Sequence, residues 1–92
     1  MIVYAECEFF IPASHSLKDK RAVLQRMLVR ARQKFNLSAA EIGHQDVWQR
    51  TRLALVTVAS TREAAEREMQ RVLHFLDSNS AWERLSTETD YL

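Results

Sequence analysis

Residues 2–21 read IVYAECEFFIPASHSLKDKR, and this stretch decides how the rest of the chain is interpreted. Residues 2–11 alternate between two faces, and a period of two with β-branched and aromatic residues predicts a strand. Pro12 ends the strand, because proline lacks the amide hydrogen that a sheet ladder needs. Ser16 is a favourable helix N-cap, with Asp19 as a weak capping-box partner three residues on. The stretch therefore predicts a strand followed by a helix.

The rest of the chain continues in the same manner. Apolar residues recur at helical spacing, so the first helix should cover residues 17–35 and stop at Asn36. A weaker strand is predicted over 38–44, and a central, buried strand over 52–60. Ser60 and Glu63 form a capping box before a second helix. That helix should end near 78–80, and residues 82–91 should form an edge strand.

This order of elements predicts an α+β, ferredoxin-like βαββαβ fold. Its four-stranded antiparallel sheet has the order 4-1-3-2, with two helices on one face. Residues 1–92 should form a single domain, because the length leaves no room for two. The topology brings three polar segments to one end of the sheet: residues 15–21, 44–50 and 78–82.

Composition excludes several classes of protein. The net charge of +1 does not by itself indicate a nucleic-acid-binding protein. Cys7 is the single cysteine, so neither an intrachain disulfide nor a cysteine-rich zinc site can form, and we interpret it as a core thiol. The N-terminal residues lack a basic leader, and no run reaches the roughly 18 apolar residues of a membrane span. We therefore expect a cytoplasmic protein that does not associate with membranes.

Three cations, Lys18, Lys20 and Arg21, lie at the start of the predicted first helix, where the helix dipole disfavours positive charge. One hypothesis is an anion site, to which Arg50 and His44 would contribute from the hairpin, with Trp48 as a stacking surface. The alternative is that these cations pair internally with the acidic residues at positions 19 and 46. In that case the Lys20 side chain would extend past the core to solvent.

The first helix is also basic beyond its start. Arg26, Arg30 and Lys34 follow one another at intervals of four residues, and no acidic residue faces them within the helix. An acidic partner, an acidic neighbouring subunit or a phosphate backbone would neutralise this ladder. The alternative is an ordinary solvated helix face.

The sheet face away from the helices does not have the composition of an RNA-recognition motif. It should carry Tyr4, Glu6, Glu8 and Phe10, and its carboxylates would repel phosphate. If the third strand points Ala54, Val56 and Val58 toward the helices, three further residues join the open face: Leu53, Leu55 and Thr57. Such an apolar face predicts a homodimer through the sheet.

The sequence offers few combinations of residues that are typical of a catalytic site. It contains no Ser-His-Asp arrangement, P-loop or dinucleotide fingerprint. Its three histidines lack metal-ligand spacing, and His44 with Asp46 would offer only two ligands on one turn. His15 could act as an acid or base beside an anion site, but nothing requires it. We therefore predict no catalytic residue, metal or cofactor, and leave enzymatic activity open.

Three motifs carry a resemblance to a known family: SLKDKR (16–21), FNLSAAE (35–41) and DVWQR (46–50). Together they resemble the YlxP-like family of small bacterial proteins over nearly the whole chain, although the C-terminal segment matches loosely. The resemblance implies a ferredoxin-like fold and a cytoplasmic bacterial protein. It implies no activity, since members of that family are uncharacterised. Genes of the family often lie among those for translation, which favours a role with RNA by association.

The leading prediction is a small non-enzymatic protein that binds RNA or a ribosomal particle through its basic first helix. Trp48 would stack, and six cations would contact phosphate: Lys18, Lys20, Arg21, Arg26, Arg30 and Arg50. Two alternatives stay open. One is a homo-oligomeric interaction module that uses the open sheet face, and the other is a small-anion-binding protein with its site at the 15–21/44–50 edge.

Overall fold

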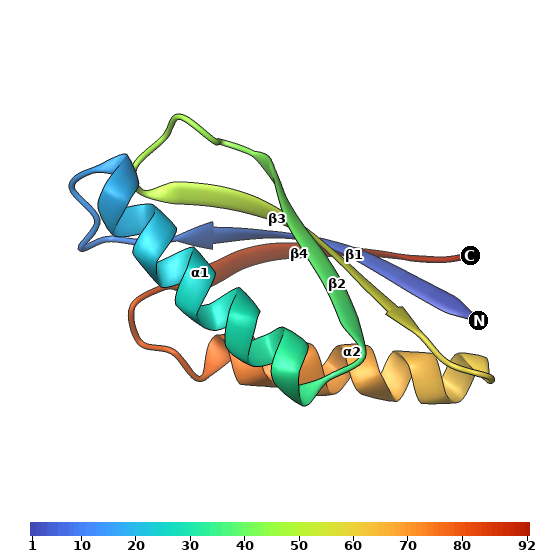
Figure 1. Ribbon diagram of the computed structural model, residues 1–92. Helices are drawn as coiled ribbons and strands as arrows, with labels where there is room; N and C mark the ends of the chain where they lie inside the picture. Colours follow the sequence, from blue (N-terminus) through green and yellow to red (C-terminus); the bar gives the residue numbers. More distant parts are fainter.

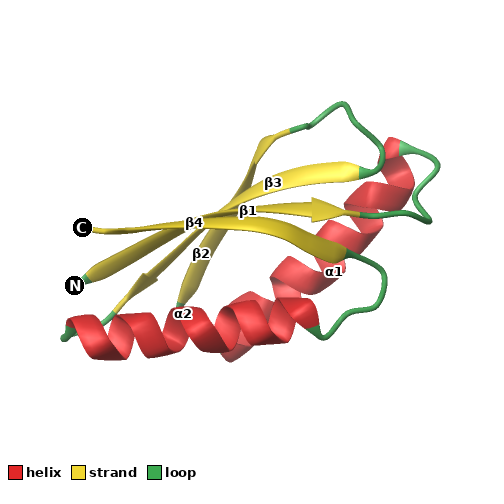
Figure 2. Cartoon of the chain, turned by 180° about the vertical axis from the view of Figure 1, so that it is seen from behind, coloured by secondary structure: helices red, strands yellow, loops and turns green.

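Six elements in the order β-α-β-β-α-β make up the computed structural model, which describes residues 1–92 (Figure 1). They are β1 (Ile2–Phe10), α1 (Leu17–Lys34), β2 (Leu37–Gly43), β3 (Arg50–Val58), α2 (Arg62–Asp77) and β4 (Glu83–Tyr91). The strands form one antiparallel sheet in the order β2-β3-β1-β4. Both helices cover the same face of this sheet (Figure 2). The predicted ferredoxin-like fold, its strand order and the edge position of the last strand are confirmed.

The core lies between the sheet and the two helices. Alternate residues of β1 point into it, from Val3 to Phe9, and none of them is more than 1% exposed. Helix α1 contributes Leu24, Met27, Leu28 and Ala31, and α2 contributes Ala65, Met69, Val72, Leu73 and Leu76. Neither helix has the length and apolar character needed to cross a membrane.

The predicted orientation of β3 is wrong. Leu53, Leu55 and Thr57 are fully buried against the helices, whereas Val56 and Val58 lie on the open face. The register explains this orientation, because Cys7 pairs with Leu53 and Ala5 with Leu55, and directly opposed residues share a face. The sequence did not reveal the choice, because β3 is apolar at alternate positions of both faces.

The helix starts follow the sequence signals with one correction. Ser16 caps α1, and its hydroxyl accepts a hydrogen bond from the Asp19 amide at 3.0 Å. For α2 the cap is Thr61, whose hydroxyl accepts from the Ala64 amide at 3.1 Å, and not the predicted Ser60. The helix therefore begins one residue later than a Ser60 cap would place it.

Trp82 fixes the connection between α2 and β4. Its indole stacks on Phe9 with ring centroids 4.2 Å apart, and its Nε1–H donates to the Leu76 carbonyl at 2.7 Å. The segment after α2 is therefore held at the end of β1, as the topology predicted.

Candidate nucleic-acid interface

Lys20 joins the start of α1 to the β2–β3 hairpin. Its side chain is fully buried, and its ammonium group donates to the carbonyls of His44 at 2.7 Å, Gln45 at 3.1 Å and Arg50 at 3.3 Å. The Glu41 carboxylate lies 3.0 Å from the same nitrogen. Four oxygen atoms therefore surround this ammonium group.

The burial of Lys20 corrects two sequence interpretations. The residue cannot contact an external phosphate, so it does not belong to the predicted binding set. Its ammonium group does not reach solvent past the core either, because Glu41 and the hairpin carbonyls enclose it. The Thr51 hydroxyl donates to the same Glu41 carboxylate at 2.6 Å, which holds the carboxylate in place.

Further hydrogen bonds hold the hairpin loop against the segment before α1. The Gln49 side chain donates to the carbonyls of Pro12 and Ser14, and the Gln49 carbonyl accepts from the Ile11 amide at 2.8 Å. His44 takes a left-handed conformation, with φ of 60°, where the chain turns out of β2. The structure thus brings the 15–21 and 44–50 segments together, as the topology predicted.

The exposed residues at this end of the sheet differ in whether contacts within the protein already occupy their side chains. Lys18 and Arg21 are exposed and make no ion pair, so the predicted internal pairing with the acidic residues at positions 19 and 46 does not occur. The Asp19 carboxylate instead accepts from the His15 amide. Trp48 is 54% exposed on the hairpin loop. Arg50 lies 3.4 Å from the Glu8 carboxylate, so its charge is partly neutralised.

Most unpaired cations of the molecule belong to α1. Six of the thirteen lysines and arginines lie within 4.0 Å of a carboxylate, and seven do not. Six of those seven come from α1, and the seventh from α2: Lys18, Arg21, Arg26, Arg30, Arg32, Lys34 and Arg67. The basic character of this helix is therefore not compensated within the chain.

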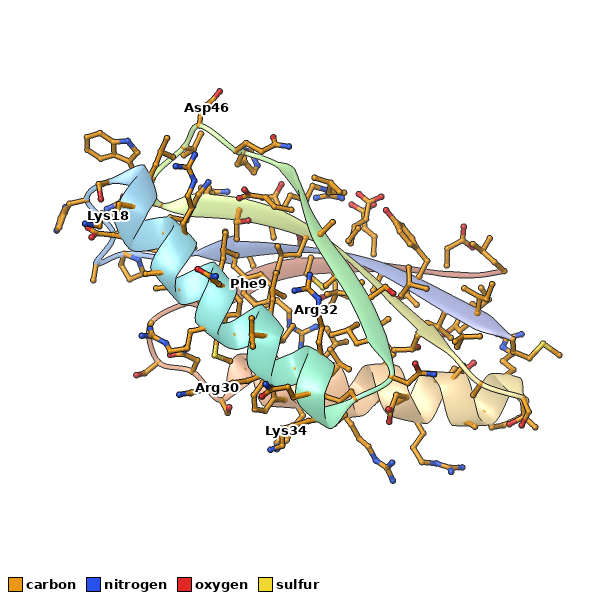
Figure 3. All side chains as sticks on the ribbon, in the orientation of Figure 1. Phe9, Lys18, Arg30, Arg32, Lys34 and Asp46 are labelled. Carbon is orange, nitrogen blue, oxygen red and sulfur yellow. The ribbon has the colours of Figure 1, made fainter.

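The α1 cations point in two directions. Figure 3 shows Arg30 and Lys34 on the side of α1 that faces α2, and Arg32 on the side toward β2. Arg32 donates to the Ala39 carbonyl of β2 at 2.6 Å. The ladder of Arg26, Arg30 and Lys34 accordingly runs along the seam between the two helices.

That seam is hollowed into a groove, here called the interhelical groove. One hollow of about 500 Å³ is lined by Lys34, Phe35, Arg67, Gln70, Arg71, His74, Phe75 and Ser78. A second of about 330 Å³ is lined by Arg26, Met27, Arg30, Phe75, Ser78, Asn79 and Ser80. The two hollows adjoin at Phe75 and Ser78, and no acidic residue is among those that line them, although Arg71 lies 3.8 Å from Glu68.

Sequence reasoning missed the α2 side of this groove. Arg67, Arg71 and His74 follow one another at intervals of four and three residues, which places them on one helix face. That spacing was a usable signal. The spacing alone does not show that these residues line a groove, because that depends on the packing of α2 beside α1, which places this face opposite the α1 ladder.

The open sheet face is neutralised by its own ion pairs. Arg52 lies 2.9 Å from Glu6, 3.2 Å from Glu8 and 3.4 Å from Glu88. A hydrogen bond from the Tyr4 hydroxyl, followed by that of Arg52, lowers the pKa of Glu6. The bond from His44 is the main cause of the lowered pKa of Glu8. The carboxylates of Glu6 and Glu8 are therefore more readily ionised, and the expectation that this face repels phosphate stays a prediction.

The same face bears on the predicted homodimer. The homodimer prediction relied partly on Leu53 and Leu55 as apolar residues of the open face, but both are buried under the helices. Exposed apolar side chains remain at the margins of this face, namely Ile2, Ile42 and Val58. Dimerisation through the sheet thus stays a prediction.

Comparison with known proteins gives a consistent family assignment. Residues 2–89 match the model of the family described as Protein of unknown function (DUF503). The chain is 52% identical over 91 residues to "Uncharacterized protein YlxP" of Bacillus subtilis (strain 168), with 99% of each chain covered. The solved structure of "De novo designed protein Foldit4" shares the fold with a TM-score of 0.61 at 13% identity, over 100% of this chain and 99% of the other. The chain belongs to the DUF503 family, which confirms the YlxP-like resemblance.

Proposed function

We propose that this DUF503 protein is a non-enzymatic RNA-binding protein whose binding surface is the cationic side of α1. One observation carries the proposal: six of the seven cations without an ion-pair partner lie on this single helix. Clustered, uncompensated cations raise the local positive potential and attract a polyanion. RNA and RNA-rich assemblies such as ribosomal particles are polyanions of this type.

The spacing of the ladder supports a repeating ligand. Arg26, Arg30 and Lys34 are four residues apart, so they recur at about 6 Å along the helix axis. A polymer with one charge per unit can follow such a row, whereas a single small anion would use only one or two of its cations. Lys18 and Arg21 add unpaired positive charge at the start of α1, beside the hairpin that carries Trp48 and Arg50, and are separate from the ladder.

The choice of face is also supported by the ion pairs. On the open sheet face Arg52 is shared by three carboxylates, so little positive charge is left for a ligand. The helix layer has an excess of unpaired positive charge, because Arg71 is the one cation lining the interhelical groove that has an ion-pair partner, Glu68 at 3.8 Å. A polyanion would therefore bind the helix layer.

The test is fluorescence anisotropy of a labelled single-stranded RNA over a range of salt concentrations. Four groove cations that contact phosphate (Arg26, Arg30, Lys34 and Arg67) give an expected slope of log K against log[salt] of about −3. Arg30→Gln should weaken binding and reduce the slope, whereas the matched control Arg62→Gln should not. Arg62 is also exposed at its helix surface, but it pairs with Glu66 at 2.9 Å.

Two results would contradict the proposal. One is affinity that does not change with salt, and the other is an equal loss in the Arg30 and Arg62 variants. Thermal stabilisation by inorganic phosphate without RNA binding would instead favour the small-anion alternative at the 15–21/44–50 edge.

A further inference from the structure

We infer that the interhelical groove holds an unpaired nucleotide, with its base against Phe75 and its phosphate among the surrounding cations, so that the protein selects single-stranded over duplex RNA. This inference rests on the proposed function and specifies its ligand. It concerns the part of the surface where α1 ends and α2 passes beside it, away from the 15–21/44–50 edge.

Aromatic and cationic groups meet at one point of the groove. The rings of Phe35 and Phe75 make an edge contact, with centroids 5.8 Å apart and planes at 63°. Both side chains are only partly buried, although they pack on the core. The Lys34 ammonium lies 4.8 Å from the Phe75 centroid. Since Lys34 is exposed and unpaired, its flexible side chain can turn to a phosphate and leave the ring to a base.

The surroundings of Phe75 favour a nucleotide over other anions. Arg67, Arg71 and His74 offer N–H donors on the α2 side, and Arg30 and Lys34 offer them on the α1 side. Three uncharged polar groups that can bond base edges also line the groove: Gln70, Ser78 and Asn79. A nucleotide combines a flat ring, polar edges and a phosphate, so it matches all three kinds of lining group.

Selection for single strands follows from this arrangement. In a duplex each base is stacked between its neighbours and its pairing edge is occupied. Phe75 could not reach such a base, so duplex RNA would contact only the cations. A single strand would gain the stacking contact as well, and it should bind more tightly at the same salt concentration.

The first experiment compares a single-stranded RNA with its duplex form at fixed salt, for wild type and two variants. Phe75→Leu removes the aromatic face but keeps an apolar side chain, and Phe10→Leu is the matched control on the open sheet face. We expect Phe75→Leu to weaken single-strand binding about fivefold or more and to leave duplex binding unchanged. Phe10→Leu should change neither affinity. Equal affinity of wild type for both RNA forms would overturn the inference.

The second experiment uses the wild-type protein, so that it does not depend on how a variant folds. Adenosine monophosphate is titrated into ¹⁵N-labelled protein, and amide shifts are followed by NMR. The inference expects the largest shifts at Phe35, Gln70 and Phe75. Shifts confined to the 44–50 loop would overturn it.

A third arm tests for a different macromolecule. Polyglutamate should compete poorly with single-stranded RNA at equal charge concentration. Equal competition would assign the groove to an acidic protein and overturn the inference. The proposed function fails separately, if wild type binds neither RNA form or if Arg30→Gln has no effect. RNA binding that is lost in Arg30→Gln but kept in Phe75→Leu would leave the proposed function standing and remove only the nucleotide site.

Discussion

Replacement of Lys20 by methionine tests whether this residue is a structural crosslink. Methionine matches the length of the apolar stem of lysine and keeps its contacts, but it lacks the ammonium group. In the wild type that group is bonded to Glu41 and to three backbone carbonyls of the 44–50 segment. The variant therefore leaves four acceptors without their shared donor.

The expected loss of stability follows from these contacts. Removal of one partner from a buried ion pair costs about 3–5 kcal/mol, because the other charge is left uncompensated. The Glu41 side chain is 21% exposed, so water can replace part of the lost bond, and we expect the lower end, about 3 kcal/mol. A domain of this size has a total stability of about 5–14 kcal/mol. With about 4–8 °C per kcal/mol, the Tm should fall by about 12–24 °C.

The assay is urea unfolding followed by far-UV circular dichroism, with a thermal melt as the second measurement. Lys18→Met is the matched control, because Lys18 lies two residues away, is exposed and makes no ion pair. Its stability should stay within about 0.5 kcal/mol of wild type. If Lys20→Met stays within the same limit, the reasoning about the buried ammonium group is refuted.

A double variant separates the unpaired charge from the lost packing. Glu41→Gln should be destabilising in the wild type, since the Lys20 charge would then lack its carboxylate. In the Lys20→Met background the same change removes a carboxylate that has lost its cation. The double variant should therefore be clearly more stable than the sum of the two single losses predicts. Additive losses would mean that the two side chains do not act as a pair.

Three further outcomes are expected. Ser16→Ala should cost about 1 kcal/mol in urea unfolding, because the first turn of α1 loses its cap. Trp82→Phe should cost about 1–2 kcal/mol in the same assay, because the Leu76 carbonyl loses its buried donor. The pKa of Glu8 is lowered in the folded protein, so its stabilisation is present above its ordinary pKa of about 4.3 and is lost as the pH falls below it. Glu8→Gln should flatten the fall in Tm that wild type shows on acidification through that range.

The sequence predicted those elements whose local signals agree. In β1 the alternation of buried and exposed residues is strict. In α1 the apolar residues lie on one face, and Ser16 marks the start of the helix. These agreeing signals made the order of the elements predictable, and with it the strand order. In β3 the alternation is weak, because Val56 and Leu55 are both apolar and either face could have been buried. Only pairing with β1 decides between them, and pairing is a non-local property.

The candidate site was less accessible to sequence reasoning, and Lys20 shows why. At about 100° per residue, Lys20 falls on the helix side of Leu24 and Met27, which points it toward the core. Its partners are mainly backbone carbonyls, which every residue possesses and no sequence motif marks. The groove was missed for a related reason. The basic face of α2 forms a groove only because α2 packs beside Arg30 and Lys34, and this packing is not visible in the sequence.

The distribution of ion pairs gives the molecule two chemically different layers. On the sheet side the carboxylates of Glu6, Glu8 and Glu88 surround Arg52, so a phosphate chain would meet paired cations and negative oxygens. On the helix side α1 carries six cations without partners. Proteins with this topology that read RNA on the open sheet need aromatic side chains there and no acidic cluster. The open face of the present chain carries Tyr4 and Phe10, but three carboxylates lie among them. The proposed RNA surface therefore lies on the helices, and Arg30→Gln and Phe75→Leu should act where Phe10→Leu does not.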